Sequence, residues 1–180
     1  MHIWEKLRKT PKEGAEDLVA AYSRRLYKFA YRLCGDASQS EDLAIRTLAR
    51  AVRANGDFAS EQAYFTFLCA ILVNLHRDDM RLKAANALNF MEEPPEVEDE
   101  RPDPAAMMAA KSDAEVVRLA IARLTPILHE TVVLRYYSAL SVADIAEALA
   151  IPEGTVKFRL SEARRKIREF LTQRKGGFAR

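Results

Sequence analysis

The sequence of 180 residues has few of the residues that form tight turns, covalent bridges and metal sites. It contains six Gly, two Cys and three His, and its most apolar run, residues 67–73, is too short to span a bilayer. Cys34 and Cys69 have no CxxC or Cys/His spacing, so we expect two reduced, partly buried thiols. A disulfide or redox-sensing pair is the less favoured alternative. The first residues have no apolar signal core, which indicates a soluble, cytoplasmic protein.

The patterns that mark common enzyme sites are also missing. The three histidines, His2, His76 and His129, are scattered, and there is neither a Gly-rich phosphate loop nor a Ser/His/Asp order. We therefore expect no catalytic residue, no metal site and no cofactor, and we interpret the chain as a protein that is not an enzyme.

The composition favours an all-α fold with unevenly distributed charge. Hydrophobic residues make up 49% and charged residues 30%, which is ordinary for a globular protein, and long windows are rich in Ala, Leu, Arg and Glu. The formal net charge is only +2, but residues 157–180 contain nine Lys or Arg against two Glu. Residues 92–104 contain seven acids against one Arg. The small net charge therefore hides a basic end and an acidic middle.

The acidic segment EEPPEVEDERPDP predicts a linker, because it combines Pro and acids with little apolar bulk. We place the linker at residues 87–112, between helical domains at 10–86 and 113–173. It is either a solvated tether or a segment that lies in a cationic channel of a partner, and the tether is the simpler interpretation. Breaks and caps predict seven helices, at Gly14–Gly35, Ser38–Asn55, Glu61–Ala85, Ser112–Arg123, Pro126–Tyr137, Ser141–Ala150 and Glu153–Thr172.

The last two predicted helices form a helix-turn-helix pattern. Ser141 and Asp144 have the spacing of a capping box, and Pro152 suits the first turn of the second helix. The second helix has one apolar seam: Val156, Leu160, Ala163, Ile167 and Phe170. Its other face is polar and basic, so it could lie in the major groove of DNA; an ordinary solvated surface is the alternative. The candidate DNA-contacting residues on that face are Thr155, Lys157, Phe158, Arg159, Ser161, Glu162 and Arg165.

Aromatic residues followed by cations mark the helix predicted at residues 61–85. Tyr64, Phe65 and Phe67 lie near its start, and Arg77, Arg81 and Lys83 lie near its end. Aromatic rings can stack on unpaired bases while cations hold phosphates, although such a stripe is more often core. We expect Phe67, Leu68, Ile71, Leu72 and Leu75 to form the core, and we expect that Tyr64 and Phe65 are not both deeply buried.

Together these segments resemble the extracytoplasmic-function (ECF) group of bacterial sigma factors over nearly the full length. The most specific stretch is GTVKFRL at residues 154–160, with Ala146, Ala163 and Arg164 around it. Glu41-Asp42-Leu43 resembles the group's polymerase-binding helix, and Asn74 and Asp78 match its helix for the −10 promoter element.

The resemblance implies a dissociable subunit that directs core RNA polymerase to promoter DNA and is held by an anti-sigma factor. It also implies that the acidic linker threads through the nucleic-acid channel of the polymerase. The helix at residues 153–172 would read the −35 element through the face described above. The −10 contacts would be Asn55, Tyr64, Phe65, Thr66, Asn74, Arg77, Asp78 and Arg81. The polymerase contacts would be Glu41, Asp42, Leu43, Arg46 and Arg50.

Several positions depart from the pattern of the group. Ile45, Arg46, Leu48 and Val52 replace an amide, an acid and bulky aromatics on the docking helix, and Phe158 replaces a small Ser. Two alternatives therefore stay open. The chain could be a helix-turn-helix regulator that binds duplex DNA without polymerase, or a sigma-like interaction protein without polymerase docking.

Overall fold

The computed structural model describes residues 11–54, 58–89 and 113–177 of the chain. These residues form seven α-helices and contain no strand. In chain order the helices are α2 (Pro11–Cys34), α3 (Ala37–Arg53), α4 (Glu61–Asn89), α6 (Asp113–Ala122), α7 (Pro126–Tyr136), α8 (Val142–Leu149) and α9 (Glu153–Gly177). The all-α prediction is confirmed. The largest differences from the predicted ends are at the C-termini of α4 and α9, which extend to Asn89 and Gly177.

The helix starts follow the local signals in the sequence. Asp36 caps α3 because its carboxylate accepts a hydrogen bond of 2.7 Å from the backbone N–H of Gln39. Pro126 occupies the first turn of α7, where its missing N–H leaves no partner unsatisfied. The predicted cap Ser112 and the linker assigned to residues 87–112 lie largely outside the described residues, so the domain limits stay a prediction.

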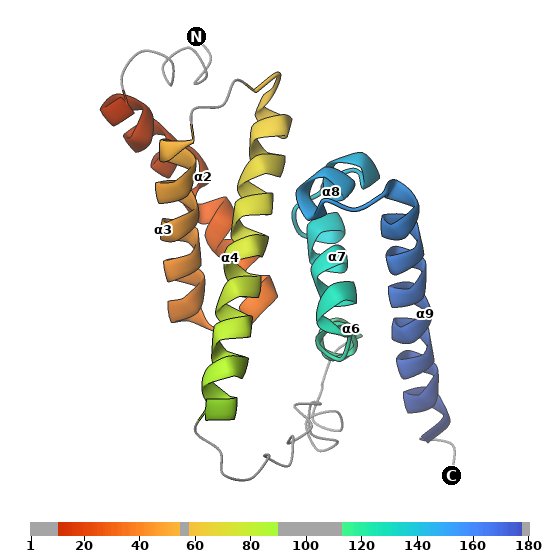
Figure 1. The fold of residues 1–180 in the computed structure, drawn as a ribbon. Helices are drawn as coiled ribbons and strands as arrows, with labels where there is room; N and C mark the ends of the chain where they lie inside the picture. The colour runs from red at the N-terminus through yellow and green to blue at the C-terminus, as the bar shows by residue number, and fades with distance from the viewer. Residues whose placement is uncertain (1–10, 55–57, 90–112, 178–180) are drawn as a thin grey trace.

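The helices form two groups that pack against each other (Figure 1). The first half consists of α2, α3 and α4, and the second half consists of α6, α7, α8 and α9. Helix α4 contacts α8, and α2 contacts α7, so we call the region between the two groups the junction.

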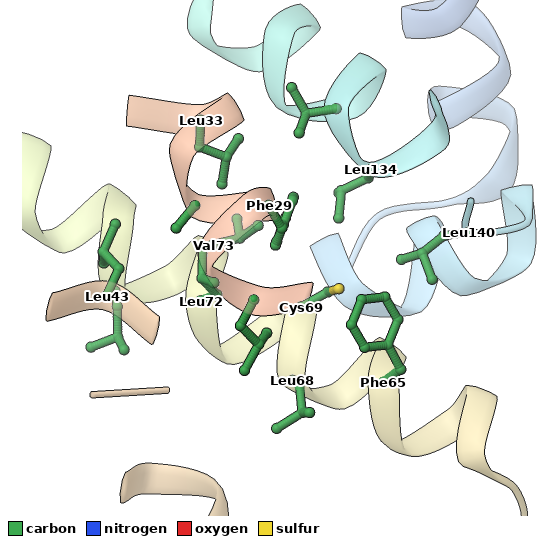
Figure 2. Close-up of a cluster of buried hydrophobic side chains, with 14 of the residues drawn as sticks. Phe29, Leu33, Leu43, Phe65, Leu68, Cys69, Leu72, Val73, Leu134 and Leu140 are labelled. Carbon is green, nitrogen blue, oxygen red and sulfur yellow. The ribbon is translucent and has the colours of Figure 1, made fainter. Parts of the chain in front are cut away.

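One hydrophobic core extends across the junction. From the first half it includes Phe29, Phe65, Leu68 and Leu72, and from the second half it includes Leu134, Leu140, Ile145 and Val156. Figure 2 shows Leu134 and Leu140 facing the part of α4 that carries Phe65 and Cys69. A smaller cluster, Leu124, Leu128, Val132 and Ala163, holds α9 against the second half. Burial of shared apolar surface therefore stabilises the closed arrangement of the two halves.

Both cysteines are free thiols, with Cys69 buried and Cys34 half-buried, as predicted. Burial raises the pKa of the Cys69 thiol to about 12. Among the described residues, no helix has the length and apolar composition needed to cross a membrane.

Candidate nucleic-acid interface

The helix-turn-helix is built by local capping and one left-handed residue. The Ser141 hydroxyl accepts a hydrogen bond from the Asp144 N–H at 3.1 Å, and the Asp144 carboxylate accepts one from the Ser141 N–H at 2.9 Å. The predicted capping box is therefore present. Helix α8 ends at Ala150, whose φ of 52° lies in the left-handed region. The next N–H, that of Ile151, donates to the Ala146 carbonyl at 3.0 Å, and this closes the turn before Pro152.

Helix α9 buries the predicted seam and exposes the opposite face. Val156, Leu160 and Ala163 are buried against α7 and α8, and Ile167 is half-buried. Phe158 projects from the other side with 68% of its surface exposed. The predicted phase of this helix is therefore confirmed. A large aromatic side chain that meets water on a basic face is a candidate contact for a partner.

Ion pairs within α9 hold several of the candidate DNA-contacting residues. Lys157 lies 3.4 Å from Glu153, one turn earlier. The Arg165 guanidinium donates to both oxygens of Glu162, at 2.8 and 2.5 Å, and also to Glu169. The hydrogen bond from Arg165 lowers the pKa of Glu162. These pairs lie in water, so they contribute little to stability and can exchange for phosphate contacts.

Arg159 is less accessible than the α9 face around it. Its side chain is half-buried, and its Nη1 is buried without a hydrogen-bond partner among the described residues. Burial raises the pKa of Glu130 on α7, and the charge of Arg159 is close enough to oppose that rise. Thr155 and Glu162 are half-buried, whereas Ser161 is exposed. Exposure to solvent therefore varies across this face of α9, and Arg159 is less exposed than Lys157 and Arg165.

The start of α4 differs from the prediction. Tyr64, Phe65 and Thr66 are all buried, whereas Phe67 and Ile71, expected in the core, are half-buried. The expectation that Tyr64 and Phe65 are not both deeply buried is wrong. In this arrangement neither ring, nor Thr66, is accessible to a DNA strand.

The first half and the junction together cause this burial. The Phe65 ring stacks on Tyr22 of α2, with centroids 6.3 Å apart, and the Arg25 guanidinium lies 3.3 Å from the Phe65 centroid. Tyr64 packs edge-on against Tyr22 and Phe58, and burial raises its pKa to about 12. Helix α4 is apolar at nearly every position between residues 63 and 75, and this signal indicates burial on more than one face.

The other candidate −10 residues are spread along α4. Asn74, Asp78 and Arg81 are exposed, and Arg81 lies 3.4 Å from Asp78. Arg77 crosses the junction and donates two hydrogen bonds to Glu130, which the sequence did not single out. The signal for Glu130 was present, because it is the one acid in the stretch ILHETVVL. Asn55 lies outside the described residues.

The candidate docking residues on α3 are also only partly accessible. Glu41, Asp42 and Arg50 are exposed, but Leu43 is buried in the core and in this structure cannot contact a partner. Arg46 bonds Asp42 at 2.8 Å and, with both Nη atoms, Asp79 of α4 at 2.9 and 3.0 Å. These hydrogen bonds raise the pKa of Arg46. Ile45 is 59% exposed beside this pair.

The side chains near these surfaces do not form a metal centre. Among the described residues, no group of three or more His, Cys, Asp or Glu side chains could hold a metal ion. The arrangement offers cations, amides and one exposed aromatic ring, which are the groups that contact phosphates and base edges.

Comparisons with known proteins agree with these features. Residues 18–85 match the family model of Sigma-70 region 2, and residues 114–167 match that of Sigma-70, region 4. The ECF RNA polymerase sigma factor SigL of Mycobacterium tuberculosis is 34% identical over 168 residues, which covers 86% of this chain and 92% of SigL. The RNA polymerase sigma-H factor of Pseudomonas aeruginosa is 27% identical over 172 residues, with 91% of this chain and 89% of that factor covered.

A solved structure shows the same fold. The sigma factor RpoE of Bartonella quintana, crystallised with the anti-sigma factor NepR, superimposes with a TM-score of 0.67 at 24% identity, covering 89% of this chain and 98% of that chain. The fold and the two matched regions define a transcription initiation factor of the sigma-70 class. Within that class, the chain belongs to the ECF group of sigma factors, which direct transcription from promoters.

Proposed function

We propose that this chain binds core RNA polymerase through α3, holds the −10 element with α4 and reads the −35 element with α9. In this role it is a cytoplasmic specificity subunit without catalytic residues or a cofactor. The domain limits 10–86 and 113–173 accompany this proposal. Promoter DNA and core polymerase are the proposed partners, and an anti-sigma factor is a third, because the matching RpoE structure contains one.

The observation that carries the −35 assignment is the division of α9 into a buried seam and an exposed polar face. Lys157, Phe158 and Arg165 project from the exposed side. The ion pairs of Lys157 and Arg165 lie in water, so phosphates can replace their carboxylate partners. Phe158 can contact the methyl group of thymine in the major groove.

Run-off transcription with purified core polymerase and a promoter selected from random DNA tests the function. We expect a product with one start site that depends on the added chain. Lys157→Ala should weaken duplex binding evenly across sequences and reduce the salt slope by about one unit. Phe158→Ser should change the order of preferred promoters. If both variants bind as the parent does, α9 is not the reading helix.

The positions of α3 that depart from the pattern of the group lie on the helix that we propose to bind the polymerase. Arg46 is neutralised within the chain by Asp42 and Asp79, so the exposed apolar contact available to the polymerase is Ile45. Ile45→Asp should reduce core binding about tenfold or more in a pull-down assay without DNA, because it places a carboxylate in an apolar contact. Leu82→Asp is the matched control, because Leu82 is 61% exposed and lies on α4. Unchanged core binding in Ile45→Asp would show that Ile45 is not the docking contact, whereas no core binding by the parent would favour the alternative of a sigma-like protein without polymerase docking.

A further inference from the structure

A buried carboxylate joins the two halves of the molecule. Glu130 on α7 is only 6% exposed, and its two oxygens accept hydrogen bonds from Arg77 on α4. The bonds are 3.0 Å from Nε and 2.6 Å from Nη2, which is a two-pronged geometry. Burial raises the pKa of Glu130 and Arg77 opposes that shift. The pair is the one ion pair across the junction among the described side chains.

Glu130 also lies near a second cation, Arg159 of α9. Burial raises the pKa of Glu130, and the positive charge of Arg159 opposes that rise less than Arg77 does. Arg159 Nη1 is buried without a hydrogen-bond partner among the described residues. One carboxylate therefore attracts an arginine from each of the two helices proposed to contact DNA. While Arg77 Nε and Nη2 bond Glu130, these two donors cannot contact a phosphate or a base edge.

The junction also covers the apolar part of α4. Phe65 and Cys69 are fully buried in the core that Leu134 and Leu140 of the second half complete (Figure 2). In the first turn of α4, the Gln62 side chain also donates a hydrogen bond of 3.3 Å across the junction to Asp144 of α8. The side of α4 that packs against α8 becomes accessible only if the second half moves away.

We propose that Glu130 is an intramolecular latch that keeps the two halves closed and withholds Arg77 and the start of α4 from DNA. The closed form is then an autoinhibited state that needs no second protein. A surface that is accessible only in a minor open state binds its ligand more weakly by the open fraction. Weakening the latch therefore increases apparent affinity without adding any contact.

Cys69 is a native reporter of the open state. It is buried at the junction, and Ser138, in the turn between α7 and α8, is its neighbour from the second half. In a Cys34→Ser background, monobromobimane can label only Cys69, because the chain has two cysteines. We expect Glu130→Gln to label about tenfold faster than the Cys34→Ser parent, with unchanged helical circular dichroism.

Glu169→Gln is the matched control. It removes the same charge from an exposed glutamate that bonds only Arg165 on its own helix. It should label at the parent rate. Equal rates in Glu130→Gln and Glu169→Gln would overturn the latch.

A second variant covers the case in which Glu130→Gln does not fold. Arg32→Gln removes a contact across the junction at the surface, where the guanidinium lies 4.6 Å from the centroid of the Tyr137 ring. It should increase Cys69 labelling about twofold to threefold, since an exposed cation–π contact is weak. No increase in a folded Arg32→Gln protein would also contradict the proposal.

The inhibitory role, which rests on the proposed function, has a separate readout. Glu130→Gln should bind a fluorescent single-stranded oligonucleotide of the selected −10 sequence about tenfold more tightly than Glu169→Gln, measured by anisotropy. Faster labelling with unchanged oligonucleotide binding would overturn the inhibitory role while leaving the labelling result intact. Failure of the proposed function would instead appear as no start-site-specific transcript from the parent chain.

Discussion

Helices α4 and α9 present their aromatic side chains in opposite ways. Phe65 near the start of α4 is 0% exposed, whereas Phe158 near the start of α9 is 68% exposed. Helix α4 packs against α2, α3 and α8, so almost its whole circumference near Phe65 is covered. Helix α9 packs on one side only, against the other helices of the second half.

The difference shows that a sequence pattern for nucleic-acid contact does not fix accessibility. On α9 the side that carries Lys157 and Arg165 has no neighbouring helix among the described residues, so these two cations remain in water. On α4, in contrast, Tyr64, Phe65 and Thr66 are buried, and Arg77 bonds Glu130 across the junction. A recognition helix that packs on one face is ready to bind, whereas one that packs on several faces needs a change of conformation first.

The largest expected effect tests the burial of α4. Phe65→Ala should lower the free energy of unfolding by about 3–5 kcal/mol, because it removes a fully buried ring and leaves a cavity. Phe158→Ala is the matched control and should change it by less than about 0.5 kcal/mol. Urea denaturation followed by circular dichroism measures both. Equal losses would mean that Phe158 is buried and that the contrast between the two helices is false.

The second prediction separates two arginines of α9. Arg159→Ala should lower the free energy of unfolding by about 1–2 kcal/mol, because Glu130 would lose one of the two cations that stabilise its buried charge. Arg165→Ala removes only exposed ion pairs, so its urea midpoint should match the parent. If Arg165→Ala is the more destabilised variant, the graded burial of this face is wrong.

The third prediction concerns two histidines, His76 on α4 and His129 on α7. Burial lowers the pKa of each below the ordinary value of 6.5, so the unfolded chain binds protons more readily than the folded one. The free energy of unfolding is therefore not reduced by these two histidines above pH 6.5, and it decreases as the pH falls below 6.5, because the unfolded chain then takes up protons more readily. At about pH 5.5, one unit lower, the loss is at most about 1.4 kcal/mol for each histidine.

Urea midpoints measured between about pH 7.5 and pH 5.5 test this prediction. Glu130 contributes with the opposite sign, because its raised pKa lets the folded form take up a proton as pH falls towards the ordinary value of 4.5. A His76→Gln, His129→Gln double variant should therefore lose the fall in stability between pH 7.5 and 5.5. A parent midpoint that does not decrease over this range would contradict the assigned directions.

The sequence predicted the elements well because helix boundaries depend on local chemistry. Asp36, Ser141 and Pro152 set the ends of helices through their own side chains or rings, and the spacing from Val156 to Ala163 sets the phase of α9. These signals act within a few residues.

The junction could not be predicted in the same way. Arg77 and Glu130 are 53 positions apart, and no local pattern indicates which distant residue neutralises a buried carboxylate. The deep burial of Tyr64 and Phe65 also depends on helices from elsewhere in the chain, including Tyr22 of α2. Sequence therefore identified the candidate residues of the interface but not which of them the closed form covers.

The smallest effect concerns the turn that positions α9. Ala150 adopts a φ of 52°, a conformation that costs an L-residue about 1–2 kcal/mol and costs Gly nothing. Ala150→Gly should raise the free energy of unfolding by about 0.5–1 kcal/mol, since part of the relief is offset by the greater freedom of Gly in the unfolded chain. Ala49→Gly, at an exposed position inside α3, is the opposite control and should lower it by a similar amount. Opposite signs in the urea midpoints would support backbone strain at Ala150 in the turn before α9, whereas losses in both variants would contradict it.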